Sequence, residues 1–221
     1  MNIEGVIFDL DGTLVHTIED IMDAANTMFK QYGLPVHHEA DYLRWIGNGA
    51  AKLIESALSE DHDPGQLQAY VTSFKEIYSK NLHSKSRLYN GIPGMLDELI
   101  NQGIKLSILS NKPHHLTEQV AGYYLSNWSF ISIFGQREGV PRKPDPYAAE
   151  EIADIMNVDA QKIMFVGDSP YDLKTAMAAD MIPVGVTWGY GRLDIPQSEG
   201  VIKYIRHPDE LVPLILLNEK K

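Results

Sequence analysis

Hydrophobic residues recur with two different spacings along this chain, and the spacing changes near residue 88. A short apolar run at 5–10, GVIFDL, is rich in residues that favour strands and predicts a buried parallel strand. From 17 to 82 the apolar positions recur at helical spacing, with turn signals at 33–35 and 63–65. This long stretch is therefore predicted to be almost entirely helical.

Beyond residue 88, short apolar runs alternate with helical patterns. Strands are predicted at 104–109, 130–134, 162–166 and 182–186, helices at 93–100, 115–124, 146–156 and 171–179, and a final helix at the end of 204–217. This alternation is typical of a doubly wound, Rossmann-like parallel sheet of the α/β class. The chain is thus predicted to have an α/β core domain, 1–15 and 86–221, interrupted by an all-helical domain at 16–85.

The helical insertion begins directly after the first predicted strand. In an open parallel sheet, ligands bind in the crevice outside the carboxyl ends of the strands. A helical domain inserted at this edge is expected to cover that crevice as a lid.

The composition narrows the classes of function. A formal net charge of −11 over 221 residues disfavours nucleic acid and anionic membranes as partners. An anionic substrate would need a local cation, either a divalent metal or a well-placed Lys or Arg. The absence of cysteine excludes disulfides and thiolate chemistry. We see no signal peptide, and the apolar run at 211–217 is too short to span a bilayer, so we expect a cytoplasmic protein.

Polar residues stand where three of the predicted strands end. These residues are Asp9, Asp11, Gly12 and Thr13 after the first strand, Ser110 and Asn111 after 104–109, and Asp168 after 162–166, with Lys143 in the loop before 146–156. Because the carboxyl ends of parallel strands meet at one edge of a sheet, we expect these side chains to converge. Carboxylate, hydroxyl and amide oxygens with one ammonium group suit a hard cation and a phosphate, not zinc.

Asp9 and Asp11 are two residues apart, so their side chains can lean to the same side of a strand end. Two close carboxyl groups do not both ionise at low cost. A cation bound to Asp9 would keep it ionised as the nucleophile. Asp11 would then carry the proton that goes to the leaving oxygen.

Four motifs in this order resemble those of haloacid dehalogenase-superfamily phosphatases. They are DLDGTL at 9–14, Ser110-Asn111, Lys143, and Gly167-Asp168-Ser169 followed by Asp172. The insertion resembles the small helical cap of this superfamily. Two fragments, RWIGNG at 44–49 and GVTWGYG at 185–191, are most similar to phosphoglycolate phosphatases.

The resemblance implies a Mg²⁺ ion held by the Asp9 carboxylate, the Asp11 carbonyl group and the Asp168 carboxylate. Asp172 would reach metal-bound water or orient Lys143. The reaction would pass through an aspartyl phosphate.

The resemblance also assigns groups to the substrate. Ser110 and the Asn111 amide would bind phosphoryl oxygens, and Lys143 would pair with the same group as a point charge. Gly12 permits close approach of the backbone, and Thr13 begins the next turn.

Several residues keep two interpretations. Lys112 is either a solvated charge or a substrate contact, and Arg44 either binds a substrate carboxylate or covers apolar surface. Trp188 and Tyr190 are expected mainly to pack. Similar proteins have Asp where this chain has His16, which places a group that titrates near neutral pH at the hinge of the insertion.

The expected substrate is a small phosphorylated metabolite, with phosphoglycolate first, and the expected state is a monomer or a homodimer. Hydrolysis of pyrophosphate or of a sugar phosphate, or a phosphomutase reaction, are the alternatives. Asp11 and Asp168 argue against carbon–halogen hydrolysis. Asp11 also argues against phosphonate cleavage through a Schiff base, although Lys52 is present. A binding protein that has lost turnover is the non-enzymatic alternative.

Overall fold

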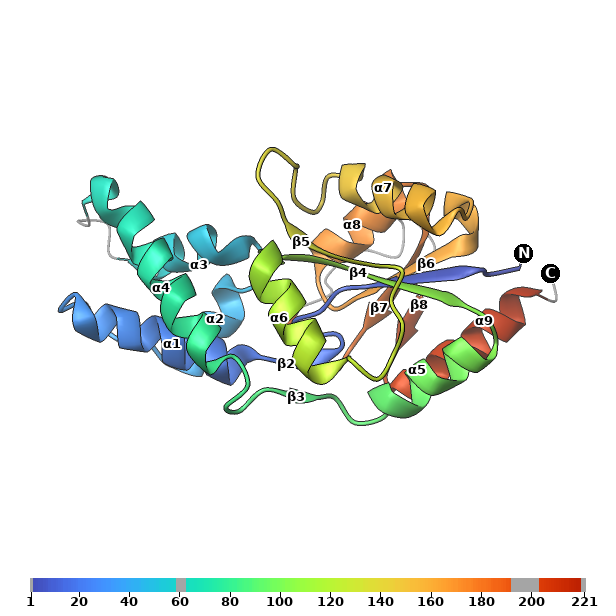
Figure 1. Ribbon diagram of the computed structural model, residues 1–221, viewed down its shortest axis with the longest axis horizontal. Coiled ribbons are helices and arrows are strands. Elements are labelled where there is room, and N and C mark those ends of the chain that lie inside the picture. Colours follow the sequence, from blue (N-terminus) through green and yellow to red (C-terminus); the bar gives the residue numbers. More distant parts are fainter. Residues whose placement is uncertain (1, 59–62, 192–202, 220–221) are drawn as a thin grey trace.

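A six-stranded sheet forms the centre of the computed structural model, which describes residues 2–58, 63–191 and 203–219 (Figure 1). Its order is β5-β4-β1-β6-β7-β8, and every neighbouring pair is parallel. The strands are β1 (Gly5–Phe8), β4 (Lys105–Pro113), β5 (Ser132–Gln136), β6 (Ile163–Gly167), β7 (Ile182–Val186) and β8 (Lys203–Ile205). The predicted α/β class with a Rossmann-like sheet is confirmed.

Helices cover both faces of this sheet (Figure 1). One face carries α5 (Ile92–Asn101), α6 (His114–Tyr124) and α9 (Leu211–Glu219). The other face carries α7 (Tyr147–Met156) and α8 (Pro170–Ala178). The described residues also form three short 3-10 helices, η1 (Pro64–Gln66), η2 (Ala160–Lys162) and η4 (Pro208–Glu210). In β1, Val6 and Phe8 pack on the first side and Ile7 on the second. Because successive strand residues point to opposite faces, a strand buried on both sides is apolar throughout.

Four helices form a separate layer beyond the sheet, at the left of Figure 1. They are α1 (Ile18–Gln31), α2 (Glu39–Trp45), α3 (Gly49–Ala57) and α4 (Leu67–Asn81). The chain enters this layer through β2 (Val15–His16) and leaves it through β3 (Arg87–Leu88), and these two strands pair antiparallel. The stretch predicted to be helical contains these four helices, and the layer stands where the first strand ends.

A buried carboxylate joins the helical layer to the segment that returns to the sheet. Asp20 on α1 is 2% exposed. It accepts hydrogen bonds from the backbone N–H groups of Lys85 and Ser86, both at 2.9 Å, and from Ser86 Oγ at 2.7 Å. These bonds fix the start of α1 against the second connecting segment.

The structure differs from the sequence prediction at short strands. β2 and β3 have two residues each, too few for a hydrophobic period to appear. The segment 204–217, predicted to end in a helix, starts within β8 before α9 begins. β8 owes its conformation to pairing with β7, as between Val186 and Ile205, which local pattern cannot reveal. Among the described residues, no helix has both the length and the apolar character to cross a membrane.

Candidate active site

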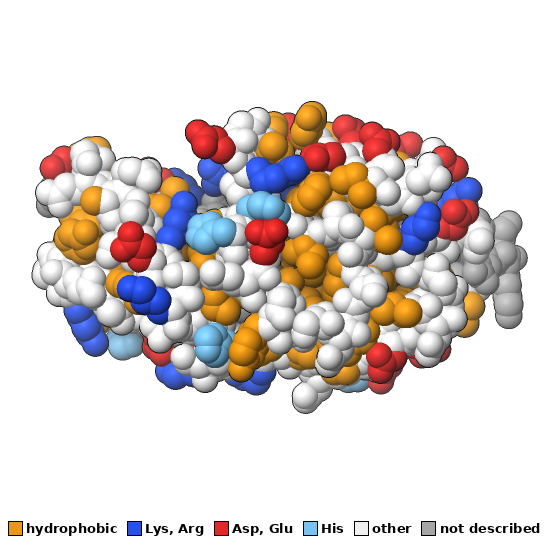
Figure 2. Space-filling model, in the orientation of Figure 1, with side chains coloured by type: hydrophobic (Ala, Val, Ile, Leu, Met, Phe, Trp, Pro, Cys, Tyr) orange, Lys and Arg blue, Asp and Glu red, His pale blue; other side chains and the backbone are white. Residues whose placement is uncertain are grey.

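A pocket of about 650 Å³ lies between the carboxyl edge of the sheet and the helical layer. Figure 2 shows the surface indented between these two parts of the molecule. The sheet side is lined by Asp9, Asp11, Ser110, Asn111, Lys112, Lys143 and Asp168. The helical side is mostly apolar, with Ile21, Leu43, Ile46, Leu53, Phe74 and Tyr78. The predicted motif residues therefore do meet at one edge, as the parallel topology requires.

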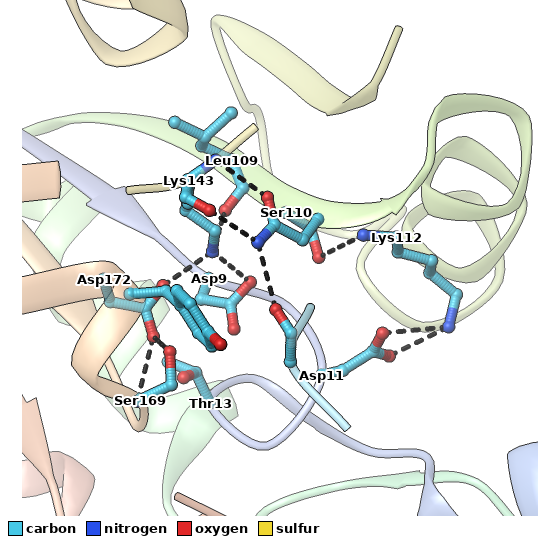
Figure 3. Close-up of polar contacts among 12 residues, drawn as sticks. Asp9, Asp11, Thr13, Leu109, Ser110, Lys112, Lys143, Ser169 and Asp172 are labelled. Carbon is cyan, nitrogen blue, oxygen red and sulfur yellow. Dashed lines mark hydrogen bonds and ion pairs between the residues drawn. The ribbon is translucent and has the colours of Figure 1, made fainter. Parts of the chain in front are cut away.

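Lys143 is the centre of the charged floor (Figure 3). Its Nζ lies 2.8 Å from Asp9 Oδ1 and 2.6 Å from Asp172 Oδ1, and it donates a 2.9 Å hydrogen bond to the carbonyl oxygen of Leu109. The Lys143 side chain is 3% exposed. A loop lysine in this position is not a surface charge, because its ammonium group is enclosed by two carboxylates.

Asp168 completes a cluster of three buried carboxylates with Asp9 and Asp172, whose oxygens lie within 4.8 Å of one another. Thr13 Oγ1 donates to Asp168 Oδ1 at 3.3 Å. Gly12 has φ +89°, and a Cβ there would lie 2.4 Å from Asp168 Oδ2. Only glycine fits this position, because both the backbone conformation and the space exclude a side chain.

Burial and mutual repulsion make ionisation of the carboxyl groups in this cluster less favourable. Burial raises the pKa of Asp9 well above its usual value, against the opposing charge of Lys143, and Asp172 and Asp168 raise it further. Burial and the charge of Asp172 raise the pKa of Asp168 to about 6. Burial acts to lower the pKa of Lys143, but Asp172 and Asp9 raise it above the usual value. The cluster has three carboxylates, and the Lys143 ammonium group pairs with two of them, so a further positive charge would be stabilised there.

Asp11 points away from this cluster, toward Lys112 (Figure 3). Lys112 Nζ donates to both of its carboxylate oxygens at 3.0 Å, and Thr17 Oγ1 donates to Oδ1 at 2.7 Å. Lys112 Nζ also donates to the Tyr78 hydroxyl on α4 at 2.8 Å. The Lys112 side chain is 4% exposed, which excludes the solvated-charge alternative for this residue.

Ser110 and Asn111 occupy the end of β4 in different ways. Ser110 Oγ accepts a 3.3 Å hydrogen bond from the Lys112 N–H. The Asn111 side chain donates to the carbonyl oxygens of Gly47 and Lys143, at 3.0 and 3.1 Å, and accepts from the Lys143 N–H at 2.9 Å. Its amide group therefore holds the Lys143 loop and contacts the helical layer. Direct binding of phosphoryl oxygens by these two residues stays a prediction.

The remaining candidates lie at the edge of the pocket or outside its lining. Arg44 borders its mouth, but the side chain is 69% exposed and pairs with Asp41 on the same helix. Lys52 is exposed and pairs with a neighbour on α3. His16 packs edge-on against the rings of Tyr89 and Tyr190, and burial, followed by the charge of Arg87, lowers its pKa.

Three residues of the site have no functional role in the sequence prediction. Thr17 and Tyr78 contact the Asp11–Lys112 pair, and nothing in their local sequence distinguishes them from other helix residues. Tyr190, for which the sequence predicts packing, lines the pocket and also makes hydrogen bonds. Its position between two glycines, at 189 and 191, is the one signal that the backbone there approaches another group closely.

Comparison with known proteins gives a consistent result. Residues 6–186 match the family model described as haloacid dehalogenase-like hydrolase. The phosphoglycolate phosphatase of Rhodospirillum rubrum is 32% identical over 197 residues, covering 86% of this chain and 81% of that protein. The phosphoglycolate phosphatase of Pectobacterium atrosepticum is 29% identical over 220 residues, covering 96% of this chain and 92% of that protein. The crystal structure of a predicted phosphoglycolate phosphatase from Haemophilus somnus has a TM-score of 0.87 and 28% identity, covering 97% of this chain and 99% of that one.

Proposed function

This chain belongs to the haloacid dehalogenase-like hydrolase family, and we propose that it hydrolyses a small anionic phosphomonoester with the Asp9 carboxylate as nucleophile. It is a phosphatase. The finer assignment depends on one observation above the others. Asp9, Asp168 and Asp172 form a buried carboxylate cluster at the floor of the pocket, and the Lys143 ammonium group pairs with Asp9 and Asp172.

The cluster fits a magnesium ion. All its donors are hard oxygens, which suit this cation, and the excess of negative charge in a buried place favours it. Asp9 and Asp168 would hold Mg²⁺ directly. Asp172 has Oδ1 on Lys143 and Oδ2 on Ser169, so we assign it a contact through metal-bound water. When bound, Mg²⁺ would supply positive charge beside the phosphoryl oxygens.

The residues of this chain divide the reaction between them. The Asp9 carboxylate attacks phosphorus, forming an aspartyl phosphate as the bond to the leaving oxygen breaks. Asp11 first has to turn from Lys112, which donates to both of its oxygens in the structure. In the protonated form it donates its proton to the leaving oxygen and then takes one from the water that hydrolyses the intermediate. Lys112 and Thr17 hold the Asp11 carboxyl group in its position before the reaction, and Lys143 offsets charge on the transferred phosphoryl group.

The helical layer would act as the cap. We place its limits at 16–85, so that β2 and β3 carry the hinges. Its apolar side chains would exclude water from the phosphoryl group once the pocket closes. The side of the pocket formed by this layer faces the leaving group and thus governs the choice of substrate.

Phosphoglycolate is the first candidate substrate, supported by the names of the similar proteins. Arg44 stands at the mouth of the pocket and would have to leave Asp41 to bind the carboxylate of the glycolate group. A panel of phosphoglycolate, pyrophosphate, nucleoside monophosphates and hexose phosphates, compared by kcat/KM, tests this assignment. A flat, weak profile contradicts phosphoglycolate but leaves the phosphatase chemistry intact.

Hydrolysis of p-nitrophenyl phosphate with and without Mg²⁺ tests the chemistry. We expect metal-dependent turnover by the wild type, and a loss of at least about 10⁴-fold in Asp9→Asn, because the variant lacks the nucleophile. Asp154→Asn removes an exposed carboxylate of α7 and serves as the matched control. Turnover without metal, or activity retained by Asp9→Asn, contradicts the proposal.

A further inference from the structure

Tyr190 connects the carboxylate cluster to the first helix of the helical layer. The N–H groups of Tyr190 and Gly191 donate to Asp168 Oδ2 at 2.7 and 3.0 Å. At its other end, the Tyr190 hydroxyl accepts hydrogen bonds from the N–H groups of Thr17 and Ile18, the latter at 3.0 Å. One side chain therefore spans from the floor of the pocket to the start of α1.

The backbone around Tyr190 fits closely against Asp168. A Cβ on Gly189 would lie 2.3 Å from Asp168 Cβ, and a Cβ on Gly191 would lie 1.9 Å from the Asp168 carbonyl oxygen. Trp188 Nε1 also donates to the carbonyl oxygen of Thr13 at 3.0 Å. Because this loop packs directly on Asp168 and donates two hydrogen bonds to its carboxylate, we expect a change in the position of the carboxylate to move the loop.

The start of α1 depends on the Tyr190 hydroxyl. The first N–H groups of a helix have no partner within the helix and need an acceptor from elsewhere. Thr17 precedes α1 but makes no side-chain capping bond, and its Oγ1 donates to Asp11 instead. Tyr190 supplies the acceptor instead, and α1 then reaches the rest of the layer through its contacts with α2 and α4.

We propose that Tyr190 is a positioning residue that couples cation binding at Asp168 to the placement of α1. This inference rests on the proposed function, which places the cation at this cluster. A cation that fixes the Asp168 carboxylate also fixes the two N–H donors of the loop, and the Tyr190 hydroxyl then holds α1 against the sheet. Because Thr17 moves together with α1 and donates to Asp11, the same contact also determines the position of the Asp11 carboxyl group.

Coupling of this kind is reciprocal. If Mg²⁺ stabilises the Tyr190–α1 contact by some factor, that contact strengthens Mg²⁺ binding by the same factor. Amide exchange at the start of α1 reports the opening of the contact, and calorimetry reports Mg²⁺ affinity. The two measurements are independent of turnover and have to agree.

The experiment compares wild type, Tyr190→Phe and Tyr124→Phe, with Mg²⁺ as the ligand. Tyr190→Phe removes the acceptor but keeps the backbone bond to Asp168. Tyr124→Phe is the matched control, because its hydroxyl donates to the Ser86 carbonyl oxygen at 2.8 Å, in the other connecting segment. Hydrogen exchange of peptides covering 14–22 is measured with and without saturating Mg²⁺, beside calorimetric titration of each protein.

In the wild type and in Tyr124→Phe, we expect Mg²⁺ to slow exchange in this segment by at least about fivefold, the lower end of usual coupling. In Tyr190→Phe the slowing falls below about twofold, and Mg²⁺ binds more weakly by the factor measured as slowing in the wild type. Mg²⁺ binding to the wild type without slowed exchange overturns the coupling and leaves the proposed function intact, a result that needs no variant. Slowing retained by Tyr190→Phe also overturns the coupling. Absence of Mg²⁺ binding removes the cation site itself, and with it both proposals.

Discussion

Two regions of this molecule bury acidic side chains, and they do so in opposite ways. At the floor of the pocket, Asp9, Asp168 and Asp172 lie within 4.8 Å of one another, and the ammonium group of Lys143 pairs with two of them, Asp9 and Asp172. At the start of the helical layer, Asp20 is equally buried, but it lies alone and accepts hydrogen bonds from neutral donors of the returning segment.

This difference distinguishes the proposed catalytic site from a structural connection between the two layers. A carboxylate surrounded by neutral donors is satisfied, and its burial stabilises one arrangement of the chain. Carboxylates that crowd around a single cation keep an excess of negative charge, which costs stability until a further cation or a proton arrives. In this protein, several carboxylates close together indicate the functional site, whereas burial of a single carboxylate does not. The predictions below test this contrast, from the largest expected effect to the smallest.

Removing the shared cation should disrupt the crowded region most. In Lys143→Met we expect kcat/KM for p-nitrophenyl phosphate to fall by about 10²–10³-fold, because a buried positive group near the transferred phosphoryl group is lost. The folded state should also lose about 3–5 kcal/mol, since uncompensated carboxylates remain buried. Steady-state kinetics and urea unfolding measure the two effects.

Lys105→Met is the matched control for this change. Lys105 is half-buried on β4, and its Nζ donates to the Met156 carbonyl oxygen, far from any carboxylate of the cluster. We expect it to keep the activity of the wild type. If Lys143→Met keeps its activity as well, the shared ammonium group has no part in the reaction.

The pH dependence of stability gives a second test of crowding. The pKa of Asp168 is raised to about 6 in the folded state, so the folded protein binds its proton more tightly than the unfolded chain. This contribution is present below pH 4 and is lost as pH rises toward 6. Without metal, the stability of the wild type relative to Asp168→Asn should fall by on the order of 3 kcal/mol between pH 4 and pH 7.

Urea unfolding of both proteins across this range, in the presence of a chelator, measures that difference. Mg²⁺ should abolish most of the fall, because it replaces the proton as the positive partner of the carboxylate. A difference that rises with pH would mean that hydrogen bonds to the Asp168 carboxylate outweigh the effect of crowding.

Neutralising Asp20 examines the other region. Asp20→Asn removes one acceptor from three neighbouring donors and should cost about 1–3 kcal/mol of stability. Because Asp20 touches no group of the floor, kcat on p-nitrophenyl phosphate should stay within about twofold when the protein is kept folded at low temperature. Asp23→Asn, an exposed residue of α1 that pairs with Lys85, should cost much less. A large loss of kcat without a loss of stability would give Asp20 a role in the reaction.

The same contrast explains what the sequence could reveal. Asp9, Ser110 and Asp168 stand at strand ends, and parallel strands place their carboxyl ends together, so the floor follows from the order of elements. Asp20 and Tyr78 lie in ordinary helical patterns. Their partners are more than 30 residues away and are brought close by packing between layers, which no local pattern encodes.

Substitution of Arg44 has the smallest expected effect. It tests whether an exposed charge pair, unlike the buried carboxylates, can be broken with little effect on stability. It is the one arginine that lines the pocket among the described residues, yet its side chain is 69% exposed and pairs with Asp41. An exposed charge pair contributes little to stability and costs little to break. We therefore expect Arg44→Ala to leave the unfolding midpoint and the kcat for p-nitrophenyl phosphate unchanged, while KM for phosphoglycolate rises by about two- to fivefold through loss of an exposed charge contact.

Lys52→Ala, which removes an exposed charge outside the pocket lining, should leave that KM unchanged. Equal KM values for wild type and Arg44→Ala would assign the leaving-group carboxylate to another partner, and Lys112, the buried cation nearest the helical side, would be the next to test.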